Sequence, residues 1–167
     1  SQEGPVWADV RAWLARRVGL IDAVVFSGGE PTTDPALSGA LRDARALGLL
    51  VGLHTAGIYP RRLQALLPAV DWVGLDVKAP LGQAASHERI TGLRGSAEAV
   101  RQSLHAVLAS GVPFEVRTTA HPDLLSDADL LQLGQDLAGL GVQHYAVQRF
   151  RRTGQPNSPL RTTPLDY

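Results

Sequence analysis

Four times along the chain, an amphipathic run ends in a glycine and is followed at once by a short run rich in branched or aromatic apolar residues. The glycines are Gly19, Gly48, Gly111 and Gly141, and the apolar runs are 20–26, 49–55, 112–119 and 142–150. Glycine readily takes the left-handed backbone conformation that closes the last turn of a helix, so each of these glycines marks a helix end. The repeat therefore predicts helices that alternate with strands.

Further signals complete this alternation. A fifth strand is predicted over 71–78, after Pro68, and a helix over 7–18. Apolar residues at helical spacing mark three more helices, with the faces Leu37, Ala40, Leu41, Ala44 and Leu47; Val100, Leu104, Val107 and Leu108; and Leu130, Leu133, Leu137 and Leu140. Asp34 is predicted to cap a helix that begins at Pro35. Ser126 with Asp129 resembles a capping box.

Strands joined by single helices pair in parallel, as an α/β sheet or as a partial or complete barrel. Five strands in 167 residues are too few for a closed eight-stranded barrel. In the run 71–78, the residues Val73, Leu75 and Val77 share one face, while the other face carries Trp72, Gly74, Asp76 and Lys78. A polar second face favours a curved sheet around a cavity. The predicted fold is one α/β domain over 1–167, with parallel β/α repeats that form a partial, open TIM-like barrel.

The composition limits the partners. Sixteen basic and sixteen acidic residues balance, which argues against a broad nucleic-acid-binding face. No run is apolar enough for a membrane span and the start has no signal-peptide pattern, so the expected location is the cytoplasm. Cysteine is absent, which excludes disulfides and any thiolate metal site made by these residues alone. Methionine is absent too, which suggests a processed or truncated chain.

The sharpest local signal is the segment Ser27-Gly28-Gly29-Glu30-Pro31-Thr32, directly after a predicted strand. Two glycines let the backbone approach a ligand because no β-carbon is in the way, and the Glu30 carboxylate can accept hydrogen bonds from an ammonium group. The segment therefore suits the amine of an amino acid. The alternative is an ordinary strand-to-helix turn in which Glu30 is only solvated.

In its context, this segment resembles the radical S-adenosylmethionine superfamily, in which a GGEP-type loop after the second strand binds the methionyl amine. The resemblance continues through the segments 54–57 (HTAG), 71–80 (DWVGLDVKAP), 90–92 (ITG), 114–119 (FEVRTT) and 145–150 (YAVQRF), and so covers nearly the whole chain. In this order the segments are similar to the activating proteins of anaerobic ribonucleoside-triphosphate reductase, which are relatives of the pyruvate formate-lyase activating enzymes.

The resemblance implies an S-adenosylmethionine site that includes Ser27, Gly28, Gly29 and Glu30, with Glu30 and the glycines at the methionyl amine. It also implies that Asp76 and Lys78 form a DxK site on the same cofactor. Their spacing of two puts both side chains on one strand face, and the alternative is a purely structural ion pair.

Three further positions follow from the resemblance. Arg117 is a candidate for the cofactor carboxylate, and its alternative is a pairing with Glu115. His54 and Thr55 belong to a segment that departs from the family's commoner DTNG form; His54 could hydrogen-bond the cofactor or could be a structural histidine. Gln148 could reach the adenosine or a substrate peptide, or could simply line the barrel.

The resemblance also implies an activity. The intact enzyme would pass an electron from a reduced four-iron four-sulfur cluster to S-adenosylmethionine, releasing methionine and a 5′-deoxyadenosyl radical that abstracts hydrogen from a glycine of a partner reductase. Flavodoxin or ferredoxin would supply the electron. The family's cluster loop is CxxxCxxC after the first strand, and this sequence has none of its cysteines. We therefore expect that the first strand and its loop are missing before Ser1, and that the 167 residues alone are inactive.

Two other classes of function stay open. One is a cluster-free module that binds a nucleoside or an amino acid with the same loop. The other is a metal-independent lyase on a small barrel, in which Lys78 acts as an amine nucleophile.

Overall fold

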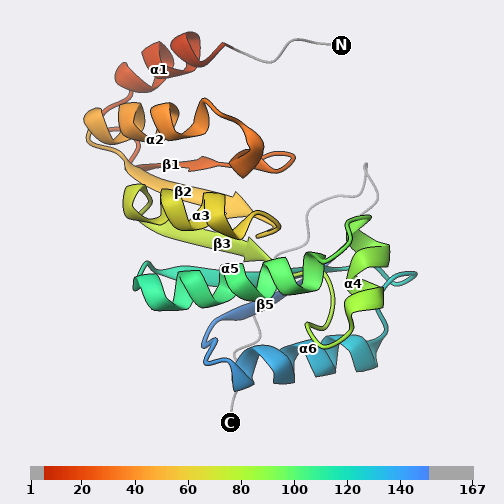
Figure 1. Cartoon of the computed structure of the whole chain (residues 1–167). Coiled ribbons are helices and arrows are strands. Elements are labelled where there is room, and N and C mark those ends of the chain that lie inside the picture. Colours follow the sequence, from red (N-terminus) through yellow and green to blue (C-terminus); the bar gives the residue numbers. More distant parts are fainter. Residues whose placement is uncertain (1–5, 151–167) are drawn as a thin grey trace.

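The structure is a computed structural model that describes residues 6–150, and it contains one five-stranded sheet (Figure 1). All neighbouring strands are parallel and lie in the order β1-β2-β3-β4-β5. The strands are β1 (Ala23–Phe26), β2 (Leu50–Thr55), β3 (Trp72–Asp76), β4 (Phe114–Ala120) and β5 (Tyr145–Arg149). The α/β fold with parallel β/α repeats is as predicted, while the ends of the predicted domain, 1–5 and 151–167, lie outside the described residues.

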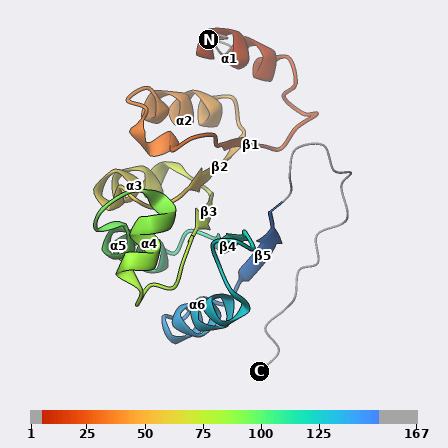
Figure 2. The ribbon, with the colours of Figure 1, turned by 90° about the vertical axis from the view of Figure 1, so that its right-hand side faces the viewer.

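Helix α1 (Trp7–Ala15) precedes β1 and contacts α2 (Leu37–Ala46), while the later helices connect successive strands and cover one face of the sheet (Figure 2). The others are α3 (Pro60–Leu66), α4 (Ala84–Thr91), α5 (Ser96–Ser110) and α6 (Asp127–Gly139), with the short 3-10 turns η1 (Pro31–Thr33) and η2 (Leu67–Ala69). The core lies between this layer and the sheet. Its fully buried members include Leu53, Val73 and Leu75 from the strands, and Leu41, Leu104 and Leu133 from the helices.

The opposite face of the sheet carries no helix of the described residues (Figure 2). On β3 the alternation is as predicted: Val73 and Leu75 are fully buried under the helices, while Trp72 and Asp76 are half-buried on the open face. The open face has small residues on three strands, Gly52 on β2, Gly74 on β3 and Ala146 on β5. Larger polar side chains of the same face therefore have room to reach across it.

The predicted helix ends at Gly48, Gly111 and Gly141 are confirmed, because α2, α5 and α6 end one or two residues before these glycines, whereas Gly19 lies four residues beyond the end of α1 at Ala15. Gly19, Gly48, Gly111 and Gly141 all have positive φ angles, between 71° and 87°. The Ser126 capping box is also present, because the Ser126 side chain accepts from the Asp129 backbone N–H and the Asp129 carboxylate accepts from the Ser126 backbone N–H.

Some predicted boundaries are wrong. Helix α2 begins at Leu37 and not at Pro35, because Asp34 accepts from the Ala36 N–H (2.8 Å) in a turn before the helix. Strand β3 ends at Asp76, so Lys78 lies just beyond the strand. The first helix ends at Ala15, three residues before Val18. The apolar runs of the sequence extend beyond the residues that form helix or strand hydrogen bonds, so composition alone cannot locate the ends of the helices and strands.

None of the helices in the described part of the chain is long and apolar enough to cross a membrane.

The outer edge of β1 is unpaired within residues 6–150, since β1 pairs only with β2. The Leu50 N–H donates to the Asp22 carbonyl (2.9 Å), so by alternation the backbone groups of Ala23 and Val25 point to the free edge. A free strand edge can pair with another chain.

We expect the 167-residue chain to self-associate with rising concentration through this edge, and Val25→Lys to reduce the association, because a charged side chain disfavours edge pairing. Val25 is 47% exposed, so the lysine fits without entering the core. Light scattering after size exclusion measures the effect. Leu131→Lys on α6, at a position 66% exposed, is the matched control. A wild-type chain that stays monomeric at high concentration contradicts the prediction.

Candidate functional site

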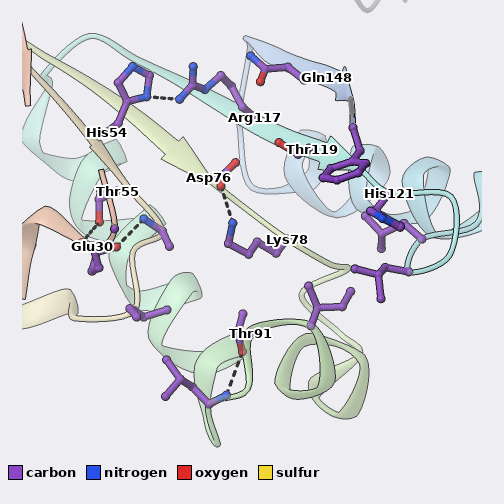
Figure 3. A pocket seen from close by; sticks show the side chains of 18 of the residues that line it. Glu30, His54, Thr55, Asp76, Lys78, Thr91, Arg117, Thr119, His121 and Gln148 are labelled. Carbon is purple, nitrogen blue, oxygen red and sulfur yellow. Dashed lines mark hydrogen bonds and ion pairs between the residues drawn. The ribbon is translucent and has the colours of Figure 1, made fainter. Parts of the chain in front are cut away.

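A cavity of about 550 Å³ opens at the carboxyl ends of the strands (Figure 3). It is lined by every predicted site residue except Ser27: Gly28, Gly29, Glu30, His54, Thr55, Asp76, Lys78, Arg117 and Gln148. Ser27 is exposed just after β1 and does not line the cavity. Parallel sheets direct strand ends and loops to one edge, which is why segments far apart in sequence meet here.

The carboxylate of Glu30 ties the loop after β1 to the end of β2. Its Oε1 accepts from the Thr32 N–H (3.2 Å), the Thr32 hydroxyl (2.5 Å) and the Thr55 hydroxyl (2.7 Å), and its Oε2 accepts from the Ala56 N–H (2.8 Å). Glu30 is therefore more than a solvated turn residue. Because a carboxylate oxygen has two lone pairs, Oε2 keeps capacity for another donor in the cavity.

Two glycines before Glu30 shape this loop. Gly28 has a φ of 96° and Gly29 a φ of 54°, a backbone conformation that other L-residues rarely adopt. No atom lies within 4 Å of where a Cβ would stand at either position. The local space is therefore open, and it is the backbone conformation that requires glycine at both positions.

Asp76 and Lys78 are both ion-paired and part of the cavity wall. Lys78 Nζ donates to Asp76 Oδ2 at 2.6 Å, and the side chains are 37% and 28% exposed. The loop that carries Lys78 is fixed to β4 by two hydrogen bonds: the buried Thr118 hydroxyl donates to the Val77 carbonyl (2.6 Å), and the Val77 N–H donates to the Arg117 carbonyl (2.8 Å). The pair is thus held at the cavity, where each group can also meet a ligand.

Arg117 contacts His54 through its guanidinium Nη2 and the ring Nδ1 (Figure 3). Its Nε lies 3.8 Å from Glu115 Oε1 and has no hydrogen-bond partner among the described residues. The predicted Arg117–Glu115 pairing is therefore present as an ion pair without a hydrogen bond. The pKa of His54 is lowered by burial and, secondly, by the positive charge of Arg117.

The sequence did not reveal the rest of the cavity wall. Thr119 follows Arg117 at the spacing of one strand face, and this signal could have placed it. The other residues come from helix α4, which was not predicted, and from loops, whose conformation has no sequence period: Ala56, Ile58, Ile90, Thr91, Leu93, His121, Leu124, Leu125 and Phe150. Several of these residues are apolar, and they line the cavity together with polar side chains such as Thr91, Thr119 and His121 (Figure 3).

Behind this wall, α4 contains a fully buried histidine. The Nδ1 atom of His87 lies 2.9 Å from the Ser96 hydroxyl, which also bonds to the hydroxyl of Thr91 (2.8 Å). The His87 Nε2 is buried with no hydrogen-bond partner among residues 6–150. Burial, and secondly the charge of Lys78, lower the pKa of His87.

The sequence profile described as "Radical SAM superfamily" matches residues 7–137, and the chain belongs to this superfamily. A Methanocaldococcus jannaschii protein provisionally named a glycyl-radical enzyme activating enzyme is 24% identical over 151 residues, which are 86% of this chain and 61% of that protein. A PqqA peptide cyclase of Xanthomonas euvesicatoria is 35% identical over 99 residues, 58% of this chain and 26% of that protein. The chain therefore spans less than two thirds of either relative.

A solved structure has the same fold. Streptococcus suis SuiB bound to S-adenosylmethionine superposes with a TM-score of 0.67 at 14% sequence identity, covering 92% of this chain and 36% of SuiB. The predicted partial barrel is thereby confirmed as a radical SAM architecture.

The donor set of the cavity fits a zwitterionic amino-acid group. Glu30 offers an acceptor for an ammonium group, and Arg117 offers a guanidinium suited to a carboxylate. An iron–sulfur cluster does not fit in the same way, because its thiolate ligands are absent from all 167 residues.

The lowered pKa of His87 predicts that acid weakens the fold. The unfolded chain takes up a proton near the usual histidine pKa of 6.5, before the folded chain does, so stability is complete above that pH and decreases below it. We expect His87 to contribute a loss of up to about 1.4 kcal/mol for each pH unit below that value.

Urea unfolding at about pH 7.5 and about pH 5.5 tests this expectation on the wild type and on His87→Gln. The variant should lose less free energy on acidification. The exposed His105 provides a control, His105→Gln, which should behave as the wild type does. Equal acid losses in the wild type and in His87→Gln would show that His87 is not the group responsible.

Proposed function

We propose that these residues are the S-adenosylmethionine-binding partial barrel of a radical enzyme that generates a glycyl radical on a partner protein, with an anaerobic ribonucleotide reductase as the preferred partner. The observation that carries the proposal is the convergence of Glu30, Asp76, Lys78 and Arg117 on one cavity at the strand ends. The superfamily membership and the relative named for glycyl-radical activation both support it.

In this proposal, each cavity residue has a defined task. Oε2 of Glu30 accepts from the methionyl ammonium, while Gly28 and Gly29 keep the loop in the required conformation. Arg117 binds the carboxylate, and the Asp76–Lys78 pair and Gln148 contact the remainder of the cofactor. When bound beside a reduced four-iron four-sulfur cluster, S-adenosylmethionine would supply the radical chemistry. The cysteines for that cluster and an electron donor such as flavodoxin or ferredoxin would come from outside these 167 residues.

The relatives support a polypeptide substrate. One is named a PqqA peptide cyclase, and SuiB has also been solved with its precursor peptide SuiA. In this chain, the apolar residues that line the cavity include Leu93, Leu124 and Phe150, which are 39–46% exposed. Such a surface suits the apolar side chains of an inserted peptide loop.

The cluster-free binding module is the second candidate, because the sequence has no cysteine. The lyase alternative has less support, since Lys78 is not a free amine but donates to Asp76 at 2.6 Å.

Glu30→Gln is expected to weaken S-adenosylmethionine binding by about 1.5–3 kcal/mol, because it removes the charge that the ammonium group meets. Titration calorimetry on the 167-residue chain measures the change, and parallel unfolding curves show whether the loop is intact. Glu98→Gln on α5, whose side chain is 59% exposed, is the matched control. An unchanged affinity would remove Glu30 from the proposed amine site.

Lys78→Met should weaken cofactor binding with little change in thermal stability, because the side chain is 37% exposed and contributes little to the core. Calorimetry and thermal unfolding of the same preparation distinguish the two roles of the pair. A strongly destabilised variant with wild-type affinity would favour a purely structural ion pair.

The glycyl-radical step has its own test. A longer polypeptide that adds a CxxxCxxC segment, loaded with iron and sulfide under anaerobic conditions, should release 5′-deoxyadenosine after reduction. It should also produce the electron paramagnetic resonance doublet of a glycyl radical on the partner reductase. Cofactor cleavage with peptide crosslinking and no glycyl radical would assign the chain to a peptide-modifying branch instead.

A further inference from the structure

His54 lies on the open face of the sheet, and its ring fills a space that the neighbouring strand leaves empty. The sheet register sets His54 of β2 beside Gly74 of β3. A Cβ added to Gly74 would lie 2.7 Å from His54 Nδ1 and 2.8 Å from the Cη2 atom of Trp72, so a larger residue would displace both rings. Trp72 meets His54 edge-on, with 5.1 Å between ring centroids. The ring of His54 is thus held by packing.

Arg117 reaches this ring across a whole strand. In the register, Arg117 of β4 lies between Asp76 of β3 and Ala146 of β5, yet its guanidinium contacts His54 on β2. Gly74 makes the crossing possible because it places no side chain in the path. Figure 3 shows His54 and Arg117 directed toward each other above Asp76.

The chemistry of the two groups fixes their protonation states. A guanidinium has only donors, so His54 Nδ1 must accept, and the proton of the neutral ring must be on Nε2. The charged groups on the neighbouring strands are Asp76, Glu115 and Arg117. Burial and Arg117 lower the pKa of His54, and this outweighs the opposite effect of the two carboxylates. Glu30 and Lys78 are the other charged groups that line the cavity beside His54.

We propose that His54 is a positioning residue: its neutral ring holds the Arg117 guanidinium across β3, in the orientation that receives the carboxylate of an amino-acid-type ligand. The inference rests on the proposed function, because it takes S-adenosylmethionine as that ligand. Protonation of His54 replaces the accepting nitrogen by an N–H, which releases Arg117 and adds a positive charge opposite a ligand that carries a sulfonium cation. Ligand affinity therefore decreases as the pH falls through the titration of His54.

The first experiment needs no ligand. Long-range nitrogen–proton correlation spectra of the 167-residue chain report the tautomer and the titration of each histidine. The expected result is a neutral His54 with its proton on Nε2 at neutral pH and a titration midpoint below the usual 6.5. A proton on Nδ1, or a His54 that is charged at neutral pH, would overturn the proposal.

The second experiment is calorimetric titration with S-adenosylmethionine at about pH 7.5 and about pH 5.5. His54→Gln keeps an oxygen acceptor that does not titrate, so it should preserve the affinity at the higher pH and bind more tightly than the wild type at the lower pH. His54→Leu offers no acceptor and should bind about tenfold or more weakly at the higher pH. Since the ligand amine titrates too, the ratio of wild-type to His54→Gln affinity is the quantity that isolates His54. His105→Gln is the control and should match the wild type.

The outcomes separate the two proposals. If the wild type binds S-adenosylmethionine and His54→Leu binds equally well, the positioning role is wrong while the proposed function stands. The same conclusion follows if the affinities of the wild type and of His54→Gln for S-adenosylmethionine change with pH in the same way. If the wild type does not bind at either pH, the proposed function fails, and the tautomer and titration of His54 still decide whether it holds Arg117.

Discussion

The structure depends on one constraint: within residues 6–150, helices cover only one face of the parallel sheet. Each crossover helix buries the apolar face of its strands, and Leu53, Val73 and Leu75 are fully buried there. The side chains on the other face contact water or pair with one another. A parallel sheet also brings the carboxyl ends of all its strands to the same edge. A polar cavity at that edge follows from the topology, before any particular side chain is considered.

Within the cavity, structural and ligand-binding roles are combined in the same side chains. Oε1 of Glu30 accepts from Thr32 and Thr55 and Oε2 accepts from the Ala56 N–H, so the carboxylate is already oriented before a ligand arrives, while Oε2 keeps a free lone pair. Lys78 and Arg117 are likewise held by chain contacts. Side chains that are fixed in this way lose little conformational freedom on binding, which favours affinity and a defined ligand orientation.

The sequence predicted the helix–strand alternation and most of the cavity's polar residues, because both follow from local rules. Glycine after a helix, as at Gly48, and two-residue alternation, as at Asp76, need no tertiary information. Contacts that depend on tertiary structure could not be predicted: the reach of Arg117 to His54 depends on the register that sets Gly74 between them. Helix α4 was missed because its eight residues contain few apolar positions, and the apolar residues of the cavity wall that lie in loops, such as Leu93 and Leu124, were missed because loops have no sequence period.

A crystal structure of the chain with S-adenosylmethionine would show whether the cavity binds this ligand, because it locates the ligand without assuming any residue's role. We expect the methionyl ammonium at Glu30 Oε2 and the methionyl carboxylate at the Arg117 guanidinium, within the cavity at the strand ends. Ligand density in another place, such as the groove between Thr33 and Arg62, or a carboxylate turned away from Arg117, would contradict this expectation.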